Sequence, residues 1–232
     1  MRQFVVWDDL YADPVMMRKY ALDMQYEQQA NKNYPGRNSV ARSMPPEMVK
    51  FISYLVGEPL KPTATSHCGG FRYQTKDDVG NQKIHIDLPG PNTRWAGVCY
   101  LSPPELYTRE DGTVLDAGTK FWKNREFGFE ELPYDIEYLA KLGINGYDDL
   151  FKFMNTEGVD ESKWIHTMSI PIKFNRLIMF RSNLWHSQGE LFGTDINDSR
   201  LIQTFFFDID NEQQAAQPQQ VPTPNKGWKT VE

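Results

Sequence analysis

The chain has 232 residues, 40% of them hydrophobic, and is long enough to bury one sizeable core. A net charge of −6 disfavours a protein that wraps nucleic acid, and Cys68 and Cys99 supply neither a disulfide framework nor a C-x-x-C metal site. No apolar run approaches the roughly 20 residues that span a bilayer, and the first residues lack the pattern of a signal peptide, so we expect a cytoplasmic protein with no membrane partner.

Residues 1–64 are expected to form a helical flank that packs on the core. Asp13 and Pro14 supply an N-cap and a first helical residue, and apolar residues continue at helical period to Met24. A second helix is predicted from Pro45 to Gly57, because its apolar residues have i, i+3, i+4, i+7 spacing: Met48, Phe51, Ile52 and Leu55. Between the helices, the polar loop 31–39 could border a site opening.

Residues 65–210 are predicted to form the core of the protein. Short β-like runs there alternate with turn signals, which indicates an all-β core with helices outside it. The expected fold class is therefore mainly β with flanking helices (α+β).

The most informative pattern in this core is His85-x-Asp87. Residues i and i+2 of a strand project from the same face, so His85 and Asp87 would point together while Ile84 and Ile86 pack on the other side. One imidazole and one carboxylate are then presented side by side.

Residues 122–168 interrupt the strand pattern. Two short helices are predicted there, over residues 138–142 and 147–154, and the segment is rich in aromatic residues that could line a pocket. A substrate lid and an extra packing layer or dimer contact are both open interpretations.

A third candidate ligand, His186, follows an apolar run over residues 177–180. Supplied by a neighbouring strand, it would complete two histidines and one carboxylate with positions left open for substrate and oxygen, which favours non-haem Fe(II). The alternative is that these are ordinary core or surface histidines, and His67 and His166 are interpreted in that way.

Arg200 is the single basic residue of the run 200–207. A guanidinium holds a carboxylate bidentately and stays charged, so Arg200 suits a dicarboxylate cosubstrate bound beside a metal. The alternative is a strand-edge arginine in a surface ion pair. Beyond this run, residues 211–232 are rich in Gln and Pro and are expected to form a flexible tail.

In the order His-x-Asp, His, Arg, the chain resembles the 2-oxoglutarate- and Fe(II)-dependent oxygenases, particularly the branch that includes the prolyl 4-hydroxylases. Three further stretches carry this likeness: residues 95–101, ending in Tyr-Leu; residues 117–121, Ala-Gly-Thr-Lys-Phe; and residues 171–180, in which Asn175 replaces the glycine of a Pro-Lys-x-Gly-Arg turn. Asparagine is the next-best residue for a left-handed turn position. The likeness covers residues 65–210 in pieces.

The resemblance implies a double-stranded β-helix, the cupin-like jelly roll, with its metal between the two sheets. Fe(II) would be held by His85, Asp87 and His186, and the far carboxylate of 2-oxoglutarate by Arg200. With O2 as the other cosubstrate, such an enzyme releases succinate and CO2 and hydroxylates a C–H bond of its substrate. No catalytic residue beyond the metal ligands is expected.

One departure from the family concerns the residues that assist Arg200. The usual Arg-x-Ser reads Arg200-Leu201-Ile202 here, so the hydroxyl is missing at that spacing. Thr204 could substitute, and Tyr73 or Tyr100 could reach the distal carboxylate of the cosubstrate. Spacing does not decide among them.

The substrate is not readable from the sequence, and a protein side chain such as proline, a free amino acid or another small metabolite all fit. A catalytically silent metal-binding jelly roll, acting as a sensor or interaction module, is the main alternative. A purely structural β-sandwich with an accidental His-x-Asp is a third. It predicts that His85→Ala and Asp87→Ala leave metal affinity unchanged.

Overall fold

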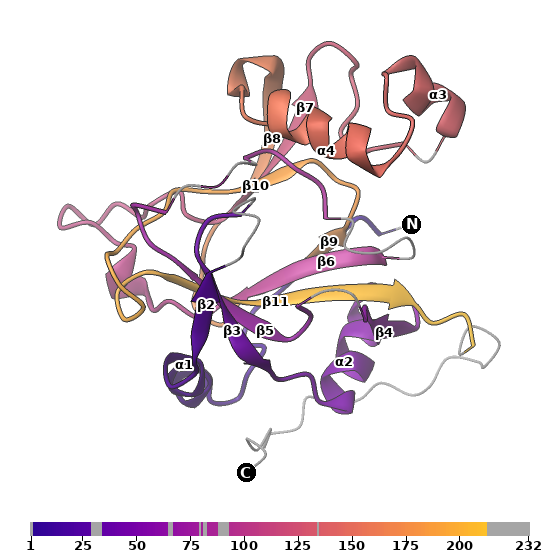
Figure 1. The fold of residues 1–232 in the computed structure, drawn as a ribbon. Helices are drawn as coiled ribbons and strands as arrows, with labels where there is room; N and C mark the ends of the chain where they lie inside the picture. The colour runs from indigo at the N-terminus through magenta and orange to yellow at the C-terminus, as the bar shows by residue number, and fades with distance from the viewer. Residues whose placement is uncertain are drawn as a thin grey trace.

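Two antiparallel sheets face one another across a shared core (Figure 1). The computed structural model describes residues 2–28, 34–64, 67–78, 80, 83–87, 93–133 and 135–212. The large sheet has the strand order β1 (Phe4–Trp7), β9 (Leu177–Arg181), β6 (Thr93–Tyr100), β11 (Arg200–Ile209), β5 (Gly70–Gln74), β3 (Arg37–Arg42), β2 (Tyr26–Gln28), with β4 (Leu60–Pro62) paired to β11. The small sheet has the order β10 (His186–Gln188), β7 (Thr119–Asn124), β8 (Trp164–Ile170). The protein is mainly β with a jelly-roll core, as predicted.

Alternation along the central strands of the large sheet separates two apolar cores. One set of side chains points toward the small sheet and forms the inter-sheet core, which includes Tyr100, Phe121, Ile178, Phe180 and Ile202. The alternate residues form the outer core against the helices, and this set includes Trp95, Cys99, Met179, Leu201 and Phe205. A side chain's position along a strand therefore decides whether it can reach the space between the sheets.

Two helices cover the outer face of the large sheet. In α1 (Pro14–Leu22) the Asp13 carboxylate accepts a hydrogen bond from the Met16 N–H, which confirms the predicted cap, although the helix ends two residues before Met24. In α2 (Pro46–Val56) the predicted apolar stripe is buried and Gly57 ends the helix in the left-handed conformation. Neither these helices nor any other in the described part of the chain is long and apolar enough to cross a membrane.

The first 64 residues contribute more than helices. They also supply β1, β2, β3 and β4 to the large sheet, which the sequence analysis missed. These strands are three to six residues long and show weak alternation of burial, so periodicity gave little signal. Of the predicted tail, residues 213–232 lie outside the described residues.

The insertion forms a third apolar core above the small sheet. The insertion contains α3 (Ile136–Lys141) and α4 (Tyr147–Thr156), whose bounds are close to those of the two predicted helices, and the short 3-10 helix η2 (Glu161–Lys163). Another 3-10 helix, η1 (Pro104–Leu106), lies outside the insertion, before β7. The buried residues of the insertion pack with side chains from the core strands, in a cluster that includes Ile84, Ile86, Leu150, Met154, Trp164 and Trp185. The insertion is thus packed onto the segment that carries His85 and Asp87.

Asn175 has the left-handed backbone conformation predicted for it, with φ of 65°. Its side chain also bridges to the N-terminal segment: Oδ1 accepts from the Tyr11 N–H at 2.9 Å, and Nδ2 donates to the Tyr11 carbonyl at 2.8 Å. The residue therefore serves both as a turn and as a link between β9 and the N-terminal flank.

These two roles can be separated by mutation. Asn175→Gly keeps the turn and loses the bonds to Tyr11, so it should lower the free energy of unfolding by about 1–2 kcal/mol. Asn175→Ala adds the cost of a left-handed alanine and should lower it by about 2–4 kcal/mol. Urea denaturation of both variants measures the difference, and equal effects would contradict a role for the backbone conformation.

Candidate metal centre

His85 and His186 are brought together by their own backbones. The His85 N–H donates to the His186 carbonyl and the His186 N–H donates to the His85 carbonyl, both at 2.9 Å. The sequence analysis predicted a strand through His85, but the structure has this isolated bridge, followed by a bond from the Asp87 N–H to the Ser182 carbonyl at 2.7 Å. Ile84 and Ile86 are buried in the insertion core, so the predicted alternation holds without a continuous ladder.

The three predicted ligands converge. One ligand atom from each of His85, Asp87 and His186 lies within 4.8 Å of the others. The His186 Nε2 is 3.2 Å from one Asp87 oxygen, and the His85 Nε2 is 3.8 Å from the other. A ligand set of two imidazoles and one carboxylate is what the 2-His-1-carboxylate sites of non-haem iron proteins use, so these residues fit a metal ion.

Backbone carbonyls orient both imidazole rings for metal binding. The His85 Nδ1 is 3.0 Å from the Lys83 carbonyl, and the His186 Nδ1 is 2.9 Å from the Leu184 carbonyl. A carbonyl only accepts, so each Nδ1 donates its hydrogen to that carbonyl, and Nε2 is the ring atom that faces Asp87 and is free to bind a metal ion. Such contacts on the far ring nitrogen are the usual support of a metal-binding histidine.

The electrostatics of the centre favour the metal-binding forms of His85 and Asp87. Burial, and next the neighbouring His186, lower the pKa of His85 to about 4, so its ring is neutral at physiological pH. Burial alone would raise the pKa of Asp87, but the charge of His186 and its hydrogen bond lower it on balance. The centre therefore offers a neutral imidazole at His85 and a carboxylate without prior deprotonation.

Aromatic side chains surround the centre. Phe180 lies against the His186 ring with centroids 4.5 Å apart, and Phe121 pairs with His186 across β7 and β10. On the other side the Tyr34 ring lies 4.8 Å from that of His85. Tyr34 belongs to the loop expected to border the opening, of which residues 31–33 lie outside the described part. His85 and His186 are thus buried among aromatic rings.

Arg200 lies in the inter-sheet space and is almost fully buried, with 3% of its surface exposed. Its Nε donates to the Ala117 carbonyl at 3.1 Å, and a terminal nitrogen donates to Gln74 Oε1 at 2.5 Å. Burial lowers the pKa of Arg200, and the neighbouring Tyr100 raises it. Its position excludes the surface ion pair that was the alternative interpretation.

Of the three residues considered as helpers of Arg200, the structure brings only Tyr100 to it. The Arg200 guanidinium lies 5.4 Å from the Tyr100 ring, and the Tyr100 hydroxyl is 2.7 Å from that of Thr119. Tyr73 is directly opposite Leu201 and packs in the outer core, on the other face of the sheet. Thr204 is four residues from Arg200 along β11, and its hydroxyl contacts the His67 and Gly70 carbonyls.

Three residues of this region escaped the sequence analysis as site residues: Gln74, Thr119 and Tyr34. Gln74 is the register partner of Arg200 on β5 and so faces the same space. Thr119 was part of a recognised motif, but only the structure places its hydroxyl beside Tyr100. The pairing of β5 with β11 was the missing information, since it assigns Gln74 rather than Tyr73 to the interior.

Comparison with known proteins places the chain in a family. A model of a family of unknown function, DUF6445, matches residues 1–207. The chain belongs to this family. Comparison with curated proteins gives no match.

Several solved structures are similar to this member of DUF6445. HygX from Streptomyces hygroscopicus, with nickel and 2-oxoglutarate bound, is 12% identical with a TM-score of 0.45, over 90% of this chain and 84% of that one. A prolyl hydroxylase from Trichoplax adhaerens, in complex with a hypoxia inducible factor peptide fragment, is 15% identical with a TM-score of 0.44, over 94% and 88%. SnoN, an α-ketoglutarate dependent epimerase from nogalamycin biosynthesis, is 12% identical with a TM-score of 0.49, over 89% and 78%. At such distances the chemistry has to be inferred from the side chains of this chain.

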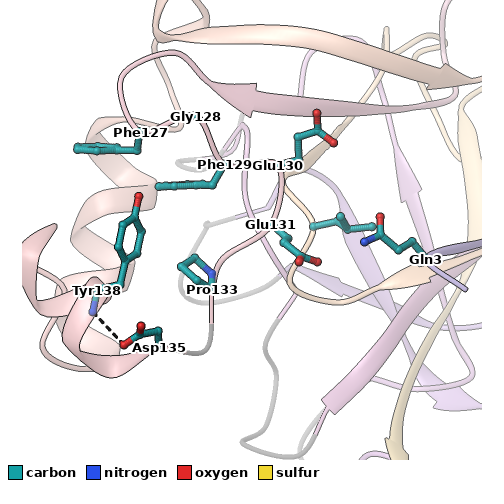
Figure 2. A pocket seen from close by; sticks show the side chains of 10 residues that line it. Gln3, Phe127, Gly128, Phe129, Glu130, Glu131, Pro133, Asp135 and Tyr138 are labelled. Carbon is teal, nitrogen blue, oxygen red and sulfur yellow. Dashed lines mark hydrogen bonds between the residues drawn. The ribbon is translucent and has the colours of Figure 1, made fainter. Parts of the chain in front are cut away.

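A separate hollow of about 560 Å³ lies on the flank of the insertion (Figure 2). It is lined by aromatic and acidic side chains, among them Phe127, Phe129, Glu130, Glu131 and Tyr138. None of the three metal ligands nor Arg200 lines it, so it is distinct from the centre between the sheets.

The assignment of the ligands predicts a specific loss of metal binding. His186→Ala and His85→Ala should each weaken Co(II) binding at least 100-fold, because each removes one of three protein ligands. The visible absorption of bound Co(II) measures this affinity. His166→Ala is the matched control, since His166 is exposed and its Nε2 contacts Ser169. Unchanged affinity in the first two variants would show that the His-x-Asp pattern is accidental.

Proposed function

We propose that this protein is an Fe(II)- and 2-oxoglutarate-dependent dioxygenase, of the prolyl 4-hydroxylase-like branch, that hydroxylates a C–H bond of its substrate. His85, Asp87 and His186 would hold the metal, which leaves coordination positions for the cosubstrate and O2. When bound, Fe(II) supplies the redox chemistry that couples conversion of 2-oxoglutarate to succinate and CO2 with hydroxylation. The substrate class, a protein side chain or a small metabolite, stays open at this level. The two cysteines are free, which agrees with a cytoplasmic enzyme.

The observation that carries this proposal is the buried Arg200 without an acidic partner. Every Asp and Glu of the chain except Glu232 lies among the described residues, and none of those carboxylates is within 4.0 Å of the Arg200 guanidinium. A buried charge without a counterion is costly to keep. An anionic ligand would neutralise it, and a carboxylate matches its fork of donors.

The path from Arg200 to the metal ligands suits a short dicarboxylate. Thr119 and Phe121 both face the inter-sheet space from β7, two residues and therefore about 7 Å apart. Thr119 contacts Tyr100 at the arginine end, and Phe121 pairs with His186 at the metal end. A five-carbon acid bound with one carboxylate at each end spans a comparable length.

The residues of the chain then have distinct roles in the reaction. Arg200, with Tyr100 and Thr119 beside it, would bind and orient the distal carboxylate. Gln74 accepts from Arg200 and so holds the guanidinium in place. Phe121 and Phe180 would exclude water around His186, which strengthens the electrostatic contacts inside the site.

The proposal predicts a visible charge-transfer band when Fe(II) and 2-oxoglutarate are added anaerobically to the metal-free protein. The band should be absent in His186→Ala. In Arg200→Ala the half-saturating concentration of 2-oxoglutarate should rise about 10- to 150-fold, as loss of a charge-assisted bond worth about 1.5–3 kcal/mol requires.

A tyrosine pair provides the matched control. Tyr100→Phe removes a hydroxyl at the arginine end and should weaken the binding of 2-oxoglutarate several-fold. Tyr73→Phe, on the opposite face of the sheet, should leave the affinity for 2-oxoglutarate unchanged. Metal binding without a band, and without 2-oxoglutarate consumption, would instead support the silent sensor or interaction module. If the protein neither binds metal nor forms the charge-transfer band, the structural β-sandwich becomes the supported interpretation.

A further inference from the structure

A second arginine, Arg72, faces the same space between the sheets. It lies opposite Ile202 in the pairing of β5 with β11, and Ile202 belongs to the inter-sheet core. Arg72 is therefore on the same face of β5 as Gln74, two residues and about 7 Å nearer the other end of the strand. Arg200 and Arg72 together give this interior two guanidinium groups.

A stack of side chains places Arg72 beside the metal ligands. Its guanidinium lies over the Tyr34 ring at 5.5 Å, and the Tyr34 ring lies 4.8 Å from that of His85. Its Nε donates to Asn38 Oδ1 at 2.7 Å, which fixes the orientation of the side chain. Among the described residues the two terminal nitrogens have no hydrogen-bond partner, and together they form a pair of donors suited to an oxyanion.

Arg72 also lacks a carboxylate partner. With every acidic residue except Glu232 described, none of those carboxylates lies within 4.0 Å of Arg72. Burial lowers the pKa of Arg72, whereas Tyr34 and Asp87 raise it. The charge of Asp87 is committed to the metal once the centre is loaded, so Arg72 then has no anion of the protein to balance it.

The two arginines differ in access. Arg200 is closed off at 3% exposure, whereas Arg72 is partly exposed. Tyr34 lies against Arg72, and the half-exposed Tyr147 at the start of α4 helps to raise the pKa of Tyr34, after burial and the charge of Asp87. Arg72 is therefore the more accessible of the two guanidinium groups for a ligand other than the cosubstrate.

We infer that Arg72 binds an oxyanion of the prime substrate, a carboxylate or a phosphate, and so holds the reacting C–H bond next to the metal. The inference rests on the proposed function and deepens it, because it limits the substrate class to anionic molecules or to side chains beside an anionic group. Arg72 acts as a specificity residue and takes no part in the cosubstrate site.

The test is calorimetric titration of the anaerobic Fe(II)·2-oxoglutarate protein with sodium sulfate and, separately, sodium acetate, at ionic strength held constant with chloride. Saturating 2-oxoglutarate occupies Arg200, so any anion bound must lie elsewhere. We expect one sulfate or acetate to bind in the wild type, at least 10-fold weaker binding in Arg72→Gln, and partial retention in Arg72→Lys. Tighter binding of sulfate than of acetate points to a phosphate group on the substrate. Tighter binding of acetate points to a carboxylate.

Arg37→Gln is the matched control. Arg37 is on the neighbouring β3, its side chain is 39% exposed, and it contacts Asp78 at 3.9 Å, so its loss should leave anion binding unchanged. Equal anion binding in wild type and Arg72→Gln would overturn the inference.

The charge-transfer band separates this failure from a failure of the proposed function. Arg72→Gln should keep the wild-type affinity for 2-oxoglutarate. If Arg72→Gln instead weakens the binding of 2-oxoglutarate as Arg200→Ala does, Arg72 belongs to the cosubstrate site. The inference is then wrong, while the dioxygenase assignment stands. If the wild type forms no band, the dioxygenase assignment fails, and the sulfate titration of the metal-loaded protein still decides whether Arg72 binds an anion.

Discussion

The site depends on one pair of reciprocal hydrogen bonds, those between the backbones of His85 and His186. The two residues are about a hundred positions apart in the chain, and this pair of bonds brings their backbones side by side. Each ring is then held at its far nitrogen by a carbonyl from its own segment, Lys83 or Leu184. The ligand geometry is thus built into the backbone, which is the rigid part of a β scaffold.

The apolar residues form three separate cores, and each core positions a different part of the protein. The outer core attaches the N-terminal helices, and the inter-sheet core encloses the space that holds Arg200. The insertion core contains Ile84, Ile86 and Trp185, which are direct chain neighbours of the three candidate ligands. Ile84 and Ile86 therefore anchor His85 on both sides, Ile86 also anchors Asp87, and Trp185 anchors His186.

Much of this arrangement could be predicted from the sequence. Local signals identified both flanking helices, the left-handed Asn175 and the helices of the insertion, because caps, apolar spacing and turn residues act within a few positions. The convergence of His85, Asp87 and His186 was also predicted, the first two from their spacing and His186 as a third ligand supplied by a neighbouring strand. Local patterns could not provide strand pairing. Without it the choice between Tyr73 and Tyr100 stayed open, Gln74 and Arg72 could not be assigned to the space between the sheets, and the short strands of residues 1–64 were missed.

The contact between Gly158 and Ile84 limits how the insertion can move. The Ile84 N–H donates to the Gly158 carbonyl at 2.8 Å, and a Cβ on Gly158 would lie 2.2 Å from the Ile84 carbonyl oxygen. This close backbone contact ties the C-terminal side of α4 to the residue next to a ligand. If the insertion moves as a body about this contact, the displacement is largest at the opposite end of α4, where Tyr147 lies. Ile84, and with it His85, then keeps its place.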